Sequence, residues 1–293
     1  METRHSPPVA LTDDDLPDLH DGANQASLRG QTLFLRATWL KLVVACTAAG
    51  VSAIPVDEDY HRVLTSFVGV CFLAVLVVEA FVWATKPERD WYDGRALAES
   101  TKTMAWRYAV GAAPYAQADP TARARFVNDL KQLLKDAPET GVHPSQKEPI
   151  SVAMERVRAG SLEERREVYL RDRLEDQRRW YAAKADRNRT RATQWRIFLL
   201  AFEGLAILGA FTGHVGAAGF IAAIVAAGAA WMGIRQHENT KRAYTFATHE
   251  LAIAGNELRM VTDEERWTEA AADAEEAVSR EHTMWRASRS SVG

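Results

Sequence analysis

The sequence predicts an all-α integral membrane protein, in which four transmembrane helices form two hairpins and long cytosolic helices pack as a helical bundle. Residues 63–85 form an apolar run whose one charged residue is Glu79. A helix of that length spans the roughly 30 Å hydrocarbon core of a bilayer. Three shorter apolar runs accompany it, and the segments between the runs show helical periodicity without any strand pattern.

A large polar remainder accompanies these runs. The chain has 293 residues, a net charge of −3 and a mean hydropathy of −0.25, so the apolar runs occupy a minority of it. A net charge this close to zero does not indicate nucleic-acid binding, which typically requires an excess of lysine and arginine. Both cysteines, Cys46 and Cys71, lie inside apolar runs, and we expect them to be packing thiols and not a disulfide.

The first half of the chain is predicted to hold a tail and one hairpin unit. Residues 1–22 are acidic and carry prolines but no apolar signal-peptide region, so we expect a disordered tail. Residues 23–137 form the first unit, with its hairpin at about residues 39–85 followed by cytosolic helices. Small residues in the first span, residues 39–56, favour close helix contact. Arg36 and Lys41 are expected to extend toward the membrane interface.

The second half repeats this order. Residues 138–150 contain several prolines and are predicted to be a linker. Residues 151–262 form the second unit, with its hairpin at about residues 196–234 and cytosolic helices on both flanks. A charged helix begins near Ser161, where Ser161 and Glu164 fit a capping box. Residues 244–261 carry apolar residues at spacings of 3 and 4, which predicts packing against another helix. Residues 263–293 form a C-terminal helix and tail.

Two carboxylates lie within the apolar runs. Glu79 stands seven residues before Lys86 and Glu203 seven residues after Arg196, which places both about 10 Å inside the membrane by helix rise. One interpretation is a ring that attracts cations in an oligomeric pore. The other is a protonated or hydrogen-bonded glutamate that fixes helix packing, which the small neighbours of Glu203 favour.

Aromatic residues beside arginines form a second group of candidates. They are candidates for membrane-interface anchoring or ligand contact: Trp91, Tyr92, Arg95, Arg107, Trp180 and Tyr181. A nucleotide or lipid headgroup could bind there, but anchoring at the interface explains the aromatic rings more simply. The charged helix over residues 163–179 is expected to present a solvated face with pairs such as Glu175 and Arg179, or to line a cytosolic vestibule.

Motifs for catalysis and metal binding do not occur in the sequence. There is no GxxxxGK[ST] loop, no HExxH and no GxSxG, and neither His237 nor His249 has a second histidine at ligand spacing. Cysteines inside apolar runs are unsuited to nucleophilic work. We therefore expect no enzymatic activity, no cofactor and no metal site.

Three stretches resemble SLATT domains, which are prokaryotic two-transmembrane modules often found beside nucleotide-synthesising or nucleotide-sensing proteins of conflict systems. In the first half the match is ERDWYDGRALAESTKTMAWRYAVGAAPY, directly after the second predicted span. In the second half it is YLRDRLEDQRRWYAAKADRNR before the hairpin and KRAYTFATHELAIAGNEL after it. Two such units in tandem would cover about residues 25–262.

This resemblance implies a membrane pore or channel that ends or arrests the infected cell. The alternative is a non-conducting membrane scaffold whose helices recruit a cytosolic partner. Expected partners are the lipid bilayer, further copies of the chain, ions, and a cytosolic activating protein or nucleotide. The expected location is the inner cell membrane.

We predict four crossings with both termini cytoplasmic. Near the spans, lysines and arginines gather on one side, where Arg29, Lys86, Arg196 and Arg235 lie, while the two predicted turns carry only Arg62. A cysteine placed at Gly293 should therefore react with an impermeant thiol reagent only after cells are permeabilised. Labelling of that cysteine in intact cells would show that the orientation is wrong.

Overall fold

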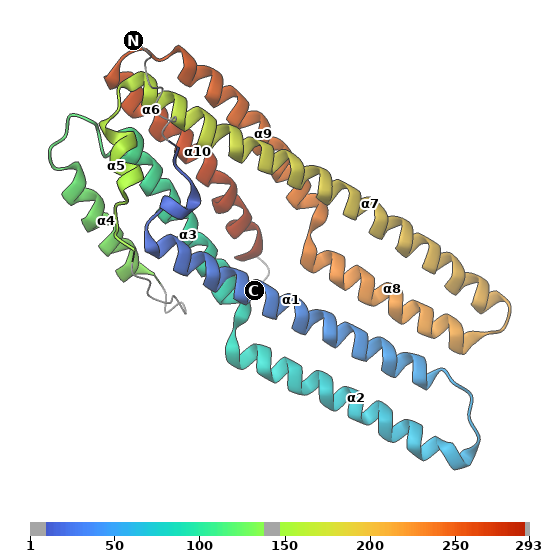
Figure 1. Ribbon diagram of the computed structural model, residues 1–293. Coiled ribbons are helices and arrows are strands. Elements are labelled where there is room, and N and C mark those ends of the chain that lie inside the picture. Colours follow the sequence, from blue (N-terminus) through green and yellow to red (C-terminus); the bar gives the residue numbers. More distant parts are fainter. Residues whose placement is uncertain (1–9, 138–146, 291–293) are drawn as a thin grey trace, which may run out of the picture. The chain divides into compact units, whose positions relative to one another are not determined.

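The computed structural model describes residues 10–137 and 147–290, with residues 280–290 as backbone only. Within these residues every regular element is a helix, which confirms the predicted all-α class (Figure 1). The elements in chain order are η1 (Asp13–Asp15), α1 (Asp18–Ser52), α2 (Glu58–Thr85), α3 (Pro87–Val110), α4 (Ala122–Asp136), α5 (Val152–Ala159), α6 (Leu162–Val168), η2 (Tyr169–Glu175), α7 (Asp176–Phe211), α8 (Val215–Arg235), α9 (His237–Met260) and α10 (Glu264–Ser290).

Internal contacts divide the described chain into two units. We name residues 30–88 and 186–241 the apolar unit, and the described parts of residues 1–29, 89–185 and 242–293 the polar unit. Each unit takes segments from both halves of the sequence. The two units defined by contacts therefore differ from the two successive units, residues 23–137 and 151–262, that the sequence analysis predicts.

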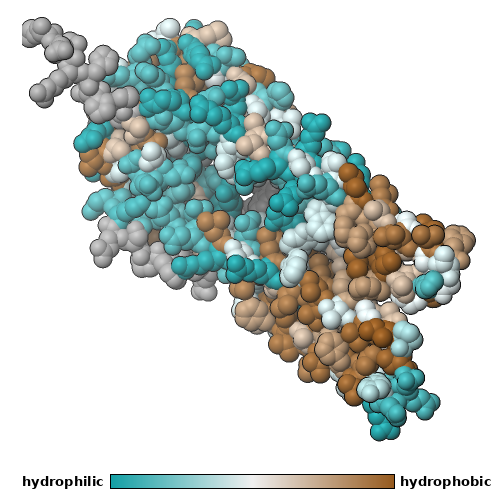
Figure 2. All heavy atoms as spheres, turned by 45° about the vertical axis from the view of Figure 1, so that its right-hand side comes forward, coloured by the Kyte–Doolittle hydropathy of each residue, from teal (hydrophilic) through white to brown (hydrophobic). Residues whose placement is uncertain are grey.

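The apolar unit consists of two helical hairpins, α1 with α2 and α7 with α8 (Figure 1). We call the end with the turns at residues 53–57 and 212–214 the tip, and the opposite end the base. Four helical stretches of the described chain are long and apolar enough to cross a bilayer, as predicted. Large apolar side chains point outward from them, including Trp83 and Phe211, which are 79% and 88% exposed. Figure 2 shows much of the surface of this unit as hydrophobic. Such a surface is stable only in lipid or against another apolar surface.

Small residues bring the two hairpins together. A Cβ atom on Gly50 of α1 would lie 2.9 Å from the ring of Phe220 in α8. A Cβ atom on Gly216 of α8 would lie 2.9 Å from the carbonyl oxygen of Ala53. These positions have no room for a larger residue, so α1 and α8 approach closely there. The small-residue contact face predicted for residues 39–56 is confirmed at these two points.

The polar unit is built around the C-terminal end of α3. Gly111 follows the helix with φ of +73°, the left-handed conformation that ends many helices. The carbonyl oxygen of Val110 accepts hydrogen bonds from Nη1 of Arg165 at 2.8 Å and from Nε1 of Trp267 at 2.7 Å. A guanidinium at this position also suits the negative end of the helix dipole. The last carbonyls of α3 therefore fix α6 and α10 against it.

A second arginine ties α5 to the loop that follows α3. Nη1 of Arg158 donates to the carbonyl oxygens of Tyr108 at 2.6 Å and Tyr115 at 2.9 Å, and Nη2 donates to that of Ala116 at 2.8 Å. Burial lowers the pKa of this guanidinium below its ordinary value. The three carbonyl oxygens compensate for the water that the buried cation has lost.

A buried triad connects η2 to α10. Nε and Nη2 of Arg173 donate to the two carboxylate oxygens of Glu275, each at 2.8 Å, and the hydroxyl of Tyr169 donates to the same carboxylate at 3.0 Å. Burial, followed by the charge of Glu275, raises the pKa of Tyr169 well above its ordinary value. Burial lowers the pKa of Arg173, but Glu275 more than offsets this, so the pKa ends above its usual range. Tyr169 and Arg173 belong to a π-helical segment, a rare geometry that changes which side chains share a face.

These contacts correct part of the prediction for residues 163–179. The capping box at Ser161 and Glu164 is confirmed, as is the ion pair of Glu175 with Arg179, at 3.2 Å. The solvated face is wrong for Arg165 and Arg173, whose side chains are each 1% exposed. Their hydrogen bonds to α3 and α10 explain why they lie inside the unit.

The predicted disordered tail also differs from the structure. Residues 1–9 lie outside the described residues, but Asp13–Asp15 form η1 and α1 begins at Asp18. Leu11 and Leu16 are 2% and 1% exposed in the core of the polar unit, which explains the order of this segment. Most of the predicted linker, residues 138–146, lies outside the described residues.

We predict that Glu275→Gln destabilises the polar unit strongly. The substitution keeps the shape of the side chain but leaves the buried Arg173 cation without its counter-charge, which typically lowers the free energy of unfolding by about 3–5 kcal/mol. Glu276→Gln, one residue further along α10 and exposed, is the matched control and should change it by less than about 0.5 kcal/mol. Equal stability of the two variants in chemical denaturation would contradict a structural role for the triad.

Candidate functional site

Glu79, the charged residue in the longest apolar run, has a partner on the neighbouring helix. Nζ of Lys41 in α1 donates to the carboxylate of Glu79 in α2. The side chain of Lys41 is 22% exposed and that of Glu79 is 59% exposed. Lys41 therefore joins the two helices of its hairpin, a contact that the sequence analysis did not predict. The pair leaves no net charge at this level of the hairpin.

Glu203 in α7 has different surroundings. Its side chain is exposed on the apolar unit, and no described residue gives it a hydrogen bond or an ion pair. Its small neighbour Gly204 faces open space, since a Cβ atom there would meet no atom within 4 Å. From its small neighbours, the sequence analysis favoured close helix packing around Glu203. The structure shows no such packing there within one copy. A carboxylate in this position needs water, a proton or a group from another molecule.

Trp91 and Tyr92 pack inside the polar unit. The Trp91 side chain is 8% exposed, its ring stacks on that of Tyr92 with centroids 5.0 Å apart, and its carbonyl oxygen accepts a hydrogen bond from Ser27 at 2.9 Å. Beside them, a Cβ atom on Gly94 would lie 2.9 Å from the carbonyl oxygen of Ala23. The pair therefore lies where α1 and α3 cross closely.

The two arginines predicted with that pair, Arg95 and Arg107, lie about 18 Å apart along α3 by helix rise. Nη2 of Arg95 forms an ion pair with Glu99 on its own helix at 2.8 Å. Nη2 of Arg107 donates to the carbonyl oxygen of Ala272 in α10 at 3.0 Å, and its Nε is buried without a partner among the described residues. The hydrogen bond of Arg107 ties α3 to α10, and Arg107 lies too far along α3 from Trp91 to share one ligand site with it.

Trp180 and Tyr181 join α7 to α9 within the polar unit. Tyr181 is fully buried, and its ring stacks on that of Tyr244 with centroids 5.3 Å apart. The Trp180 ring meets Tyr244 edge to face at 5.4 Å, and Nζ of Lys184 lies 5.1 Å from the centre of the Trp180 ring. These aromatic residues are packing residues in this structure.

Sequence reasoning missed Lys41 as the partner of Glu79. The signal was present, since each is a lone charge beside or within an apolar run. The pairing itself depends on the register of α1 against α2, which periodicity does not supply. Within the described chain no group of three or more histidine, cysteine, aspartate or glutamate side chains could hold a metal ion.

Two family models match the chain in succession. Residues 17–166 match SMODS and SLOG-associating 2TM effector domain 3, and residues 169–285 match SMODS and SLOG-associating 2TM effector domain 1. Searches among curated proteins and solved structures found no match. The tandem resemblance noted from the sequence is thereby confirmed.

We predict that Lys41 and Glu79 stabilise the first hairpin as a pair. Glu79→Gln or Lys41→Met should lower the Tm in detergent, by about 2–4 °C for each kcal/mol lost, because each leaves one charge unpaired in an apolar unit. The exchange Lys41→Glu with Glu79→Lys should recover most of the loss. Glu58→Gln, exposed at the tip end of α2, serves as the control. An exchanged variant less stable than either single variant would contradict the pairing.

Proposed function

Because the chain belongs to the SLATT family of two-transmembrane effector domains and carries two of them in tandem, we propose that it assembles into a membrane pore or ion channel. SLATT domains are membrane-associated effector modules of conflict systems. On this proposal, copies of the chain conduct ions across the inner cell membrane during a prokaryotic conflict or stress response.

The exposed carboxylate of Glu203 is the observation that carries the proposal. A charge within the hydrocarbon layer is expensive, so such residues face water or pair with another group. The described residues of one copy give Glu203 no partner. If copies assemble around this face of α7, their carboxylates form a ring around a water-filled path. Such a ring raises the local concentration of cations and favours their passage.

Several copies are required for this arrangement. The two hairpins of one copy present mostly apolar side chains, and Lys41 and Glu79 already neutralise each other. One copy therefore has too few polar groups to surround water. A closed ring built from identical contacts is the usual way for a homo-oligomer to form such a path.

On this proposal the polar unit controls the opening of the pore. With the termini and the polar unit in the cytoplasm, as the distribution of lysine and arginine favours, an activating protein or a nucleotide would act there. The proposal includes no catalytic step.

The alternative function is a non-conducting membrane scaffold that recruits a partner through the polar unit. The Lys41 and Glu79 pair favours it, because a neutralised carboxylate at this depth fits helix packing better than ion conduction. On this alternative Glu203 is protonated or contacts a second copy.

We predict unitary currents from the purified chain in a voltage-clamped planar bilayer, with a preference for cations. Glu203→Gln should shift the reversal potential under a salt gradient toward zero, since it removes the ring of charge without changing the side-chain shape. Glu257→Gln, exposed on α9 in the polar unit, should leave it unchanged.

Each variant is first compared with the parent by gel filtration in detergent, so that loss of assembly is not read as loss of conduction. A stable oligomer that passes no current favours the scaffold. Currents with an unchanged reversal potential in Glu203→Gln would remove this residue from the conduction path.

A further inference from the structure

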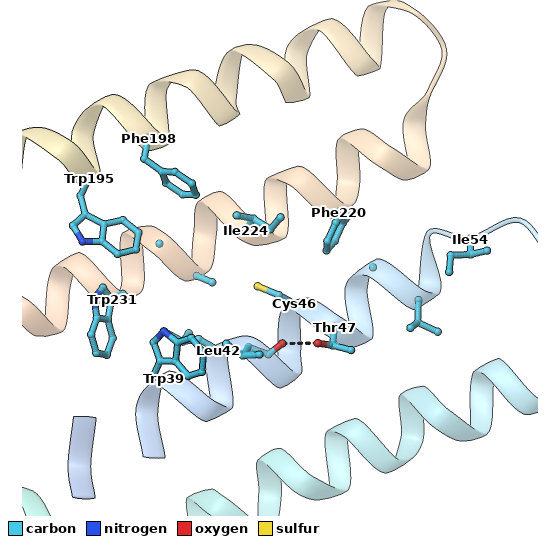
Figure 3. A pocket seen from close by; sticks show the side chains of 15 residues that line it. Trp39, Leu42, Cys46, Thr47, Ile54, Trp195, Phe198, Phe220, Ile224 and Trp231 are labelled. Carbon is cyan, nitrogen blue, oxygen red and sulfur yellow. Dashed lines mark hydrogen bonds between the residues drawn. The ribbon is translucent and has the colours of Figure 1, made fainter. Parts of the chain in front are cut away.

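A long apolar groove lies within the apolar unit, between α1 and the hairpin of α7 and α8. Its volume is about 630 Å³, which falls within the range of ligand-binding cavities. Figure 3 shows apolar side chains of α1, α7 and α8 facing one another across it, among them Leu42, Phe198, Phe220 and Ile224. All of its lining residues belong to one unit of the structure. Neither Glu79 nor Glu203 is among the residues that line the groove.

The length and the apolar walls of the groove suit an acyl chain. It extends along α1 from Trp39 to Ile54, about 22 Å by helix rise. A methylene chain of a lipid can lie along that length against the apolar walls, with its carbon atoms at contact distances of about 3.5–4.0 Å.

An apolar groove of this size in a membrane does not stay empty. Water has no polar partners along such walls, and a void forfeits the dispersion contacts of every side chain that lines it. Acyl chains are the hydrocarbon available in a bilayer. The groove is therefore expected to hold lipid.

One end of the groove carries the aromatic residues expected at a lipid headgroup. The indole rings of Trp39, Trp195 and Trp231 gather at its base end, whereas Ile54 lies at the tip end (Figure 3). They come from three different helices, and tryptophan prefers the level of the headgroups because its ring is apolar and its N–H is a hydrogen-bond donor. A lipid in the groove would have its polar group at this end.

Each of these three helices also carries an arginine one turn beyond its tryptophan, toward the base. The arginines are Arg36 in α1, Arg191 in α7 and Arg235 in α8. The guanidinium carbon of Arg235 lies 5.9 Å from the centre of the Trp231 ring. Burial, and then the charges of Arg235 and Arg191, lower the pKa of His237, so both cations act at the same place. This positive end suits a phosphate group.

From the groove, its aromatic end and its arginines together, we propose that the apolar unit binds one anionic glycerophospholipid. One acyl chain fills the groove from Trp39 to Ile54, and the phosphate lies at the base beside Arg191 and Arg235. The inference does not require the chain to conduct ions. It assigns a specific lipid contact to the space between the hairpins.

Native mass spectrometry of the protein, released from bilayers of phosphatidylglycerol and phosphatidylcholine in equal amounts, tests the acyl-chain part. The unaltered protein should retain one phosphatidylglycerol per copy. Ala227→Phe places a ring in the groove and should abolish retention. Ala226→Phe, the neighbouring exposed alanine outside the groove, is the matched control and should retain the lipid. Retention in both variants, or in neither, would overturn the proposal, as would an Ala227→Phe variant that dissociates the oligomer while keeping its lipid.

The headgroup part is tested in the same bilayers. The double variant Arg191→Gln with Arg235→Gln should retain phosphatidylcholine and phosphatidylglycerol equally, because the charge that distinguishes them is lost. Arg62→Gln, near the tip, should keep the preference for phosphatidylglycerol. A preference that survives in the double variant would show that the anionic headgroup does not lie at the base.

Discussion

A hydrocarbon layer offers no hydrogen bonds, and this constraint governs the apolar unit. Backbone groups are satisfied within helices, which is why the unit contains only helical hairpins. Most side chains that face outward from the apolar runs are apolar, and Lys41 of α1 pairs with Glu79 of α2. Glu203 is a charged exception within the described apolar runs, and an exception of this kind marks a functional position in a membrane protein.

The polar unit solves the same problem with arginine. Arg158 and Arg165 bind carbonyl oxygens at the end of α3, and Arg173 binds the carboxylate of Glu275. A planar guanidinium can satisfy several acceptors at once, so one residue fixes two or three segments. A buried cation also tolerates few alternative arrangements, because each alternative leaves it without acceptors. The unit therefore obtains its arrangement from a few polar contacts together with its apolar core.

The two hairpins are joined by a mixture of close contact and open space. Glycine at positions 50 and 216 lets α1 and α8 touch, whereas a groove remains between α1 and the second hairpin. An interface of this kind is completed by lipid, because an acyl chain fills irregular space that fixed side chains leave open. The stability of the unit then depends on lipid as well as on protein contacts.

The sequence by itself determined the helical class, the four apolar runs, and the presence of Glu79 and Glu203 within them. These features depend on composition and on local periodicity, and both can be determined from one amino-acid sequence. Residues 88–115 and 241–258 also carried the family resemblance. The capping box at Ser161 was equally predictable, because it involves residues three positions apart.

Only the tertiary structure decided which charges meet. Lys41 and Glu79 are 38 residues apart, and Arg173 and Glu275 are 102 apart, so their pairing depends on how helices cross. The same holds for Trp91 and Tyr181, which the sequence assigned to an interface or a ligand and the structure places in packed contacts. The groove is also a property of the assembled helices, since its three tryptophans come from three of them. Long-range register is set by packing, and local sequence patterns do not encode it.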